Sequence, residues 1–258
     1  MTHVSDVAVT AGRVGRRSLL RRATRAFGTL LIVAGALTLI WAVVVWQWQD
    51  PFTALYTHFQ QQHLASVYKK RVAAYTPRVR VRTFNLATAE REIAIDARRY
   101  RRTLQIGDPV GRLKIGRIGL NMIVVQGTDD ASLKKGPGHF WSTGLPGEGR
   151  LIYIAGHRTT FLAPFADIND IRNGDYVTFE LPYGTFTYRA FRHYVVPATD
   201  LALLVNHDRE VLRLQACHPR FFATHRYIVD AQLVAFEPRG SSHTFTVPPV
   251  FPVTTAQS

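Results

Sequence analysis

Residues 178–190 read TFELPYGTFTYRA, two runs of β-branched and aromatic residues separated by Pro182, Tyr183 and Gly184. Such runs on either side of a glycine-containing turn are typical of a β-hairpin. Short apolar runs broken by glycine recur from Gly107 to Phe236. The pattern predicts strands over 111–118, 122–126, 151–155, 176–181, 185–196, 211–216 and 227–236. We therefore expect a mainly β domain over residues 107–237, a closed or nearly closed β-barrel.

The other end of the chain is of a different kind. Residues 26–48 contain no charged side chain and include the 20-residue run FGTLLIVAGALTLIWAVVVW. About 20 apolar residues in a helix cross a hydrocarbon layer of about 30 Å. Trp41, Trp46 and Trp48 stand near the far end of this run, where indole rings favour the membrane interface. We predict one transmembrane helix over 26–48.

Orientation follows from the arginines that precede this helix. Residues 1–25 contain Arg13, Arg16, Arg17, Arg21, Arg22 and Arg25 against a single acid, Asp6. The positive-inside rule then places a basic, mobile tail in the cytoplasm and the later residues outside the plasma membrane. A cleaved signal peptide is the alternative, but its apolar core usually has about 7 to 15 residues and ends in small side chains.

Two segments flank the predicted barrel. Residues 49–106 predict a helical juxtamembrane stalk and a linker, with Leu55, Phe59, Leu64 and Val67 on one helix face and a second helix near 90–100. Residues 238–258 are rich in Pro, Ser and Thr without periodicity, so we expect a disordered tail.

The distribution of charge along the chain argues against one class of function, nucleic-acid binding. The net charge is +14, yet Lys and Arg are scattered along the chain rather than gathered in an aromatic-lined groove. This distribution argues against nucleic-acid binding and fits an anionic lipid or wall polymer. The clusters Lys134-Lys135 and Lys69-Lys70-Arg71 are read as solvated charge, with lipid contact as the alternative. We expect no cofactor and no metal site, because no His or Cys cluster has zinc spacing and the acids form no calcium loop.

Three reactive residues stand at the ends of predicted strands. The run RLIYIAG ends at His157, EVLRLQA ends at Cys217, and Arg226 begins the last strand. A thiol needs a nearby imidazole to exchange its proton, and a guanidinium can stabilise the oxyanion formed when an amide is attacked. The set fits a cysteine acyl-transfer site. The alternative is that Cys217, the single cysteine, is a small buried apolar residue.

Other histidines compete for the role of proton shuttle. His218 follows the thiol directly and His225 precedes Arg226. Neighbours in an extended strand point to opposite faces, so His218 should face away from Cys217 if the strand continues. We interpret His139, in GPGHFW, as a loop histidine with satisfied hydrogen bonds.

Two blocks of the sequence carry a family resemblance. Residues 147–180, GEGRLIYIAGHRTTFLAPFADINDIRNGDYVTFE, and 212–229, LRLQACHPRFFATHRYIV, resemble the signature blocks of the sortase family, as does KKGPGHFWSTGLPGEG over 134–149. The resemblance covers about 107–236 and implies a sortase-type closed β-barrel of about eight strands with short helices. The juxtamembrane DPFTALYTHFQQQ resembles actinobacterial class E sortases of Gram-positive bacteria.

The resemblance also implies an activity and its partners. Cys217, His157 and Arg226 would cleave an LPXTG or LAXTG sorting signal of surface proteins after its threonine, through a thioester resolved by a peptidoglycan precursor amine. Arg158, Thr159, Thr160, Ala216 and His218 are the candidate substrate contacts, although Arg158 to Thr160 equally fit a turn held by hydroxyl groups. Many sortases have Thr-Leu-x-Thr before the cysteine, whereas here Arg213-Leu214-Gln215-Ala216 puts substrate preference in doubt.

Two other functions stay open on the sequence. A membrane-tethered barrel could bind a wall component without chemistry, but such a module has no need of all three reactive residues. A hydrolytic cysteine peptidase would share the chemistry and use water as the acceptor.

Overall fold

The computed structural model describes residues 8–48, 51–78, 81–206, 209–241 and 243–252, and for 8–20, 45–48 and 51 it describes the backbone alone. The chain divides into two compact units, residues 1–49 and 50–258. The first unit contains one helix, α1 (Ala8–Trp48). Within it, Arg21–Val44 is long and apolar enough to cross a membrane, a criterion that a signal sequence would also meet.

Helix α1 begins earlier than the apolar run. Residues 8–25, part of the tail that was expected to be basic and mobile, are helical, because an arginine-rich segment continuous with a helix can extend it. Residues 1–7 and the side chains of Trp46 and Trp48 lie outside the described part, so the tail's first residues and the interfacial tryptophans stay predictions.

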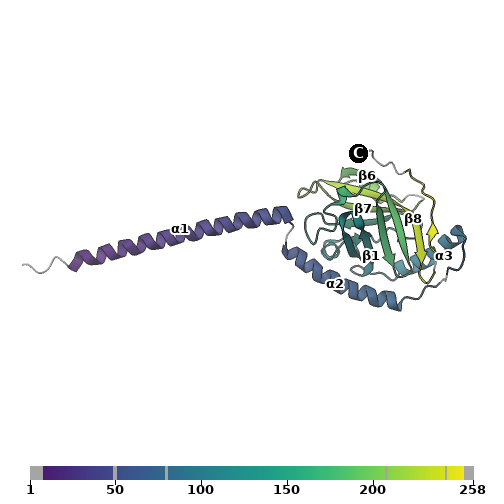
Figure 1. Cartoon of the computed structure of the whole chain (residues 1–258), viewed down its shortest axis with the longest axis horizontal. Coiled ribbons are helices and arrows are strands. Elements are labelled where there is room, and N and C mark those ends of the chain that lie inside the picture. The colour runs from purple at the N-terminus through teal and green to yellow at the C-terminus, as the bar shows by residue number, and fades with distance from the viewer. Residues whose placement is uncertain (1–7, 49–50, 79–80, 207–208, 242, 253–258) are drawn as a thin grey trace, which may run out of the picture. The chain divides into compact units, whose positions relative to one another are not determined.

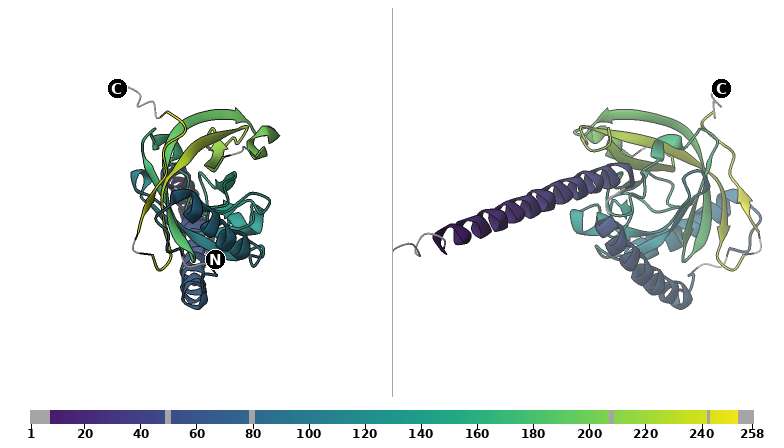
Figure 2. Two further views of the ribbon diagram at one scale, coloured as in Figure 1. Left: turned by 90° about the vertical axis from the view of Figure 1, so that its right-hand side faces the viewer. Right: turned by 60° about the vertical axis from the view of Figure 1, so that its left-hand side comes forward.

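The second unit is built on a closed barrel (Figures 1 and 2). Its strands follow the order β6-β5-β1-β2-β3-β4-β7-β8, and β8 pairs back with β6. Their bounds are β1 Pro109–Ile115, β2 Leu120–Gln126, β3 Gly138–His139, β4 Ile152–Gly156, β5 Tyr176–Leu181, β6 Gly184–Pro197, β7 Val211–His218 and β8 His225–Pro238. The pairs β2–β3 and β4–β7 are parallel, and the other neighbours are antiparallel. This closed eight-stranded arrangement confirms the predicted fold class.

Short elements connect the strands. They are α4 (Asp130–Leu133) and the 3-10 turns η1 (Gly116–Ile118), η2 (Ile168–Asp170) and η3 (Leu201–Leu204). The hairpin of residues 178–190 forms β5 and β6, with Leu181 opposite Gly184. Val177, Phe179, Phe186 and Tyr188 alternate into the barrel core, where each is fully buried. All seven predicted strands are present within a few residues of their expected bounds.

Two helices that precede residue 107, the predicted start of the domain, pack on the barrel. In α3 (Leu86–Arg101), Ala89, Ile93, Ala97 and Tyr100 enter the main core. Asn85 caps this helix by accepting a 3.0 Å hydrogen bond from the Thr88 N–H. The compact unit therefore starts at residue 50 rather than Gly107, because a helix needs a partner for its apolar stripe.

Helix α2 (Pro51–Ala74) turns a different face to the barrel than the sequence predicts. Leu64 and Tyr68 pack against Ile123 and Val125 of β2. Leu55 and Phe59, expected on the same face as Leu64, are exposed instead. The predicted juxtamembrane stalk is thus helical, and it packs on the barrel as part of the second unit.

The C-terminal segment is also more ordered than expected. Strand β9 (Phe245–Thr246) pairs with β8, and Phe245 is buried. The Gln232 side chain donates a 2.7 Å hydrogen bond to the Phe251 carbonyl and accepts from the Val250 and Phe251 N–H groups at 2.8 Å. The predicted disorder is wrong for residues 243–252, and residues 253–258 lie outside the described part of the chain.

Candidate active site

Three adjacent strands bring the predicted reactive residues to one end of the barrel. In the antiparallel pair β7–β8, Cys217 lies directly opposite Arg226. In the parallel pair β4–β7, the last matched residues are Gly156 and Ala216. His157 directly follows Gly156, so its backbone lies at the same end of the barrel as Cys217.

Side-chain alternation determines the face on which these groups lie. Leu212, Leu214 and Ala216 of β7 belong to the barrel core. The intervening Gln215 and Cys217 therefore point to the outer face, where both are partly exposed. The candidate site is an open surface on the outside of the barrel rather than its interior.

The outer face has an apolar floor beside the reactive end. Tyr153 and Ala155 of β4 and Ile228 of β8 pack together there with Leu203 of η3. The turn η3 thus packs on β4 and β8 at this face of the barrel.

The surroundings of His157 favour a neutral imidazole. Its Nε2 atom is buried and makes no hydrogen bond within the described part of the chain. Burial lowers the pKa of His157, with Lys134 acting in the same direction and Asp130 opposing it. The ring lies 5.2 Å from that of Phe161, between ring centres. A neutral ring with an unpaired nitrogen can accept a proton in general acid–base catalysis.

The guanidinium of Arg226 is occupied by the loop that precedes it. Its Nη1 donates to the Ala223 and His225 carbonyls at 2.8 and 3.0 Å. Burial raises the pKa of Tyr153 to about 12, with the charges of Arg226 and Cys217 acting on it in opposite directions. The Tyr153 hydroxyl, 2.6 Å from Gln215 Oε1, therefore lies within the electrostatic reach of both groups.

Arg158, predicted to contact substrate, is instead buried. Its Nη1 donates to His218 Nδ1 at 2.9 Å and to the Cys217 carbonyl at 3.3 Å, and its Nη2 donates to Asn169 Oδ1 at 2.5 Å. Burial lowers the pKa of Arg158, followed in effect by the charge of Arg220. This arrangement ties the loop after β4 to the end of β7 and leaves little of the guanidinium for a ligand.

The other predicted contacts divide into two groups. Ala216 has no exposed surface and faces the core, so its side chain cannot reach a substrate on the outer face. Strand β7 continues through His218, which therefore points away from Cys217 toward Arg158. Thr159 and Thr160 are partly exposed beside His157, and among the described residues neither hydroxyl makes a hydrogen bond. These two stay candidates, in a turn closed by a backbone bond from Ala163 N–H to the Thr160 carbonyl.

The remaining histidines lie outside the outer-face site. His139 is fully buried in β3, with Nδ1 2.8 Å from Gln126 Oε1 and Nε2 2.8 Å from the Gly144 carbonyl. Burial lowers the pKa of His139 to about 4, so it is a satisfied neutral histidine, as predicted, although in a strand rather than a loop. His225 is exposed, with Nδ1 2.9 Å from Thr224 Oγ1.

Sequence reasoning missed a buried ion pair under the same face. Arg213 donates to both carboxylate oxygens of Asp230 at 2.7 and 2.9 Å, and each side chain is at most 3% exposed. Arg213 also donates to the Leu203 carbonyl of η3 at 2.7 Å. The pair thus fastens η3 to the floor. Its signal was weak, because the two residues lie 17 positions apart and meet only through the β7–β8 register.

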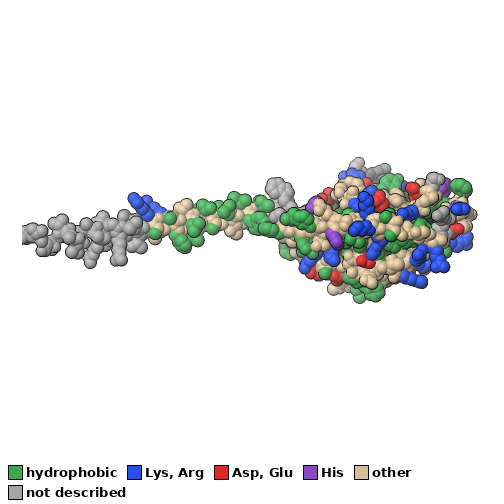
Figure 3. All heavy atoms as spheres, turned by 90° about the horizontal axis from the view of Figure 1, so that it is seen from below, with side chains coloured by type: hydrophobic (Ala, Val, Ile, Leu, Met, Phe, Trp, Pro, Cys, Tyr) green, Lys and Arg blue, Asp and Glu red, His purple; other side chains and the backbone are tan. Residues whose placement is uncertain are grey.

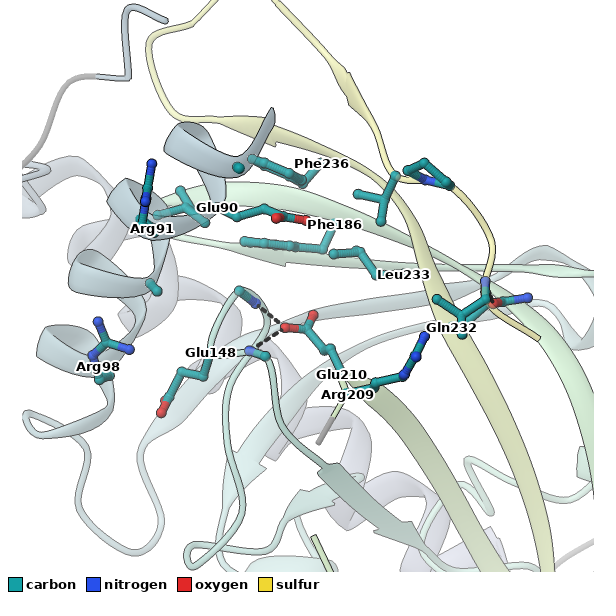
Figure 4. Close-up of a pocket in the computed structure, with 18 of the residues that line it drawn as sticks. Glu90, Arg91, Arg98, Glu148, Phe186, Arg209, Glu210, Gln232, Leu233 and Phe236 are labelled. Atoms are coloured by element: carbon teal, nitrogen blue, oxygen red, sulfur yellow. Dashed lines mark hydrogen bonds between the residues drawn. The ribbon is translucent and has the colours of Figure 1, made fainter. Parts of the chain in front are cut away.

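A cavity of about 660 Å³ lies at the other end of β7 and β8 (Figure 4). Apolar side chains of α3, β6, β8 and the C-terminal segment line it, including Phe186, Leu233 and Phe236. At its floor, the Glu210 carboxylate accepts hydrogen bonds from the Gly147 and Gly149 N–H groups, both at 2.9 Å. Within the described residues, no group of three or more His, Cys, Asp or Glu side chains could hold a metal.

Comparisons with known proteins match this part of the chain. The family model described as Sortase domain matches residues 113–234. Sortase D of Bacillus subtilis (strain 168) is 33% identical over 129 residues, 48% of this chain and 64% of the relative, so the chain spans less than two thirds of that relative's length.

Solved structures similar to this chain include two sortases. A Clostridium perfringens Sortase D5 transpeptidase superposes with a TM-score of 0.55 at 22% identity, over 68% of this chain and 98% of that chain, which shows a shared fold. Sortase E from Streptomyces avermitilis is 31% identical over 52% of this chain and 93% of that chain, with a TM-score of 0.47. The family model and the closed barrel agree, so residues 113–234 form a sortase domain.

Proposed function

We propose that this protein is a membrane-anchored cysteine transpeptidase that acts outside the plasma membrane on surface proteins carrying a sorting signal. The observation that carries the proposal is the strand register. It sets Cys217 opposite Arg226 and leads β4 to His157 at the same end of the barrel. A wall-binding module would not require a thiol, an imidazole and a guanidinium together.

The reaction proceeds in two acyl transfers. The Cys217 Sγ gives its proton to the neutral His157 imidazole and attacks the threonine carbonyl of an LPXTG or LAXTG signal. The Arg226 guanidinium turns from its loop carbonyls to the oxyanion. The Thr–Gly bond then breaks, His157 protonates the leaving amine, and a thioester remains on Cys217. An amine of a peptidoglycan precursor attacks the thioester, forms the new amide and releases the thiol.

Substrate lies along the outer face in this proposal. The floor of Tyr153, Ala155 and Ile228, with η3 packed on it, lies on the same face as Cys217. Thr159 and Thr160 stand beside His157 and can donate hydroxyl hydrogen bonds to a bound peptide. Because Ala216 faces the core, the absent hydroxyl before the cysteine affects barrel packing here rather than a direct substrate contact.

The location follows from α1. A helix with arginines before its apolar window Arg21–Val44 favours an uncleaved anchor with a cytoplasmic N-terminus. The barrel, substrate and acceptor then share the outer side of the membrane. Class E membership rests on the DPFTALYTHFQQQ resemblance and forms part of the proposal.

Mass spectrometry of the full chain in detergent tests the chemistry. The protein is incubated with LPXTG and LAXTG peptides, with and without a diaminopimelate-containing stem peptide. We expect an acyl adduct on Cys217 and, with the amine present, a product joined after threonine. The Cys217→Ala variant should bind peptide but form no adduct, whereas His225→Ala should behave as wild type.

The results separate the alternatives. Undiminished turnover by Cys217→Ala would contradict the mechanism. Release of free acid in place of the amine-joined product, at saturating amine, would identify a hydrolytic peptidase. Peptide binding without any adduct on a free thiol would point to a binding module.

A further inference from the structure

Arg158 is a buried cation that lacks a counterion. It is 8% exposed, whereas Arg213, the other buried cation among the described residues, pairs with Asp230. Figure 3 shows the usual place of such groups, since Lys and Arg side chains are scattered over one face of the second unit. Within the described part of the chain Arg158 forms no ion pair, and the nearby Asp167 is bound to Arg220 at 2.7 Å. Burial of an unpaired charge destabilises a fold, so the role of Arg158 lies in what its hydrogen bonds hold together.

The Arg158 guanidinium joins two segments that are far apart in the sequence. On one side, Nε donates to the Ala166 carbonyl at 3.3 Å and Nη2 donates to Asn169 Oδ1 at 2.5 Å. On the other side, Nη1 donates to the Cys217 carbonyl at 3.3 Å and to His218 Nδ1 at 2.9 Å. A guanidinium is planar and rigid, so these bonds fix the loop of residues 157–170 against the end of β7.

The backbone of this loop shows why it needs an anchor. Phe161, Leu162 and Ala163 have φ angles of 54°, 58° and 35°, a left-handed conformation that residues other than glycine rarely adopt. Three such residues in a row are strained, and strain persists only where surrounding contacts determine the conformation. Loss of the bonds from Arg158 to β7 should therefore let the loop relax away from that strand.

Both reactive groups are connected through Arg158. Its own peptide bond joins it to His157, and its Nη1 holds the carbonyl of Cys217. One side chain thus links the backbone of the predicted proton acceptor with the backbone of the predicted nucleophile. Proton transfer requires hydrogen-bond reach, and a displacement of about 1 Å can cost about 10²-fold in rate.

We propose that Arg158 is a positioning residue, which holds the loop of residues 157–170 against β7 and so sets the approach of the His157 imidazole to the Cys217 thiol. This inference rests on the proposed cysteine transpeptidase function and deepens it. Arg158 acts through His157, because its own guanidinium is bound by acceptors within the protein.

Alkylation of the thiol tests this role without a substrate. Cys217 is the single cysteine of the chain, so uptake of iodoacetamide by the full chain in detergent reports on this thiol alone. Because His157 accepts the thiol proton in the proposed mechanism, His157→Ala should slow alkylation at neutral pH by about tenfold. Arg158→Met should slow it almost as much, and the two changes together should add nothing further.

Turnover of LPXTG and LAXTG peptides separates positioning from substrate contact. Arg158→Met should lower kcat about 10²-fold and leave the KM for the peptide within about threefold of wild type. A raised KM with unchanged kcat would instead show a substrate contact and overturn the proposal. Arg158→Lys should be nearly as slow as Arg158→Met, since one ammonium cannot hold both segments. Full activity of the Lys variant would show that the charge alone matters, and would overturn the proposal too.

Two further variants keep the test independent of folding, which thermal unfolding checks for each chain. Asn169→Ala removes only the loop end of the Arg158 bridge, so it should slow alkylation and kcat on its own and have no further effect in Arg158→Met. Arg220→Met is the matched control, because Arg220 donates to the same loop, at the Ala166 carbonyl and Asp167 Oδ1, both at 2.7 Å. These bonds do not reach Cys217, so this variant should keep wild-type rates.

The outcomes distinguish the positioning role from the proposed function. Wild-type alkylation rates in Arg158→Met and Asn169→Ala would overturn the positioning role, as would equal rates in wild type and His157→Ala. An Arg220→Met chain as slow as Arg158→Met would also overturn it, because any damage to the loop would then have the same effect. The expected alkylation pattern without an acyl adduct from any peptide would refute the proposed function and support the positioning role.

Discussion

Removal of one partner of the Arg213–Asp230 pair should be the most damaging single change beneath the outer face. Asp230 is 1% exposed and receives two hydrogen bonds from Arg213 and one from Arg192, the last at 3.0 Å. In Asp230→Ala the Arg213 charge stays buried without a counterion. Loss of one partner of such a pair costs about 3–5 kcal/mol.

The magnitude can be checked against a solvent-exposed partner of the same carboxylate. The Arg192 side chain is 56% exposed, so Arg192→Ala should cost about 0–1 kcal/mol. For a domain of this size, 1 kcal/mol shifts Tm by roughly 2–4 °C, so Asp230→Ala should lower Tm by about 6–20 °C. Replacing both partners, as in Arg213→Met with Asp230→Leu, should recover much of this loss, because no unpaired charge is then left.

Thermal unfolding of the full chain in detergent, followed by near-UV circular dichroism, measures these shifts. Hydrogen exchange adds a local measurement. Arg213→Met removes the hydrogen bond from Arg213 to the Leu203 carbonyl, so the amide hydrogens of η3 should exchange faster in this variant. If Asp230→Ala were as mild as Arg192→Ala, or if the double variant were the least stable of all, the reasoning would be refuted.

Three further outcomes follow from other parts of the barrel. Burial raises the pKa of Glu210 to about 7, so the folded state holds this proton more tightly than the unfolded state does. The free energy of unfolding should therefore fall as pH rises from about 4.5 to 7, by at most about 3 kcal/mol and by less because the side chain borders a cavity. Urea titrations of Glu210→Gln should lack this pH dependence. The lowered pKa of His139 works in the opposite direction, so stability should fall as pH drops from about 6.5 toward 4, and His139→Gln should lack that loss in acid unfolding curves. A Cβ on Gly156 would lie 2.6 Å from the Phe165 ring, so Gly156→Ala should cost about 1–3 kcal/mol and slow acylation by displacing the neighbouring histidine, whereas Gly116→Ala, which meets nothing within 4 Å, should not.

The barrel could be predicted because most of its strands have a recognisable pattern in their own local sequence. Alternation of buried and exposed residues, as in Tyr176–Leu181, follows from backbone geometry and needs no knowledge of the neighbours. Strands β3 and β9 have two residues each, too few for any period to show. They depend on the strands beside them, which the sequence does not reveal.

The helices before the barrel show a different limit. Leu55, Phe59 and Leu64 are all apolar, but only tertiary contacts decide that Leu64 is buried while the others face outward. Apolar residues on both sides of a helix leave its rotation undetermined when the sequence alone is read.

For the candidate site, the ends of the predicted strands identified the reactive residues. The alternation of side chains between the two faces of a strand was not used, although it separates Ala216 from Cys217. His157, Cys217 and Arg226 were selected because rigid strands aim residues at their ends, and their catalytic roles stay predictions. Ala216 could have been excluded from the outer face at once, since it directly precedes Cys217 in a strand. The burial of Arg158 could not, because its partners Asn169 and His218 come from distant segments.

The small strand β9 covers an edge of β8 that β7 leaves open. Strand β7 begins at Val211, opposite Gln232, so beyond that point β8 would present unpaired N–H and C=O groups along one side. Phe245 and Thr246 pair there, opposite Phe236 and Ala235. A chain cut before Phe245 would expose this open edge, the kind of surface on which strands from other molecules add. We therefore expect a soluble form of this barrel to need the residues that follow β8.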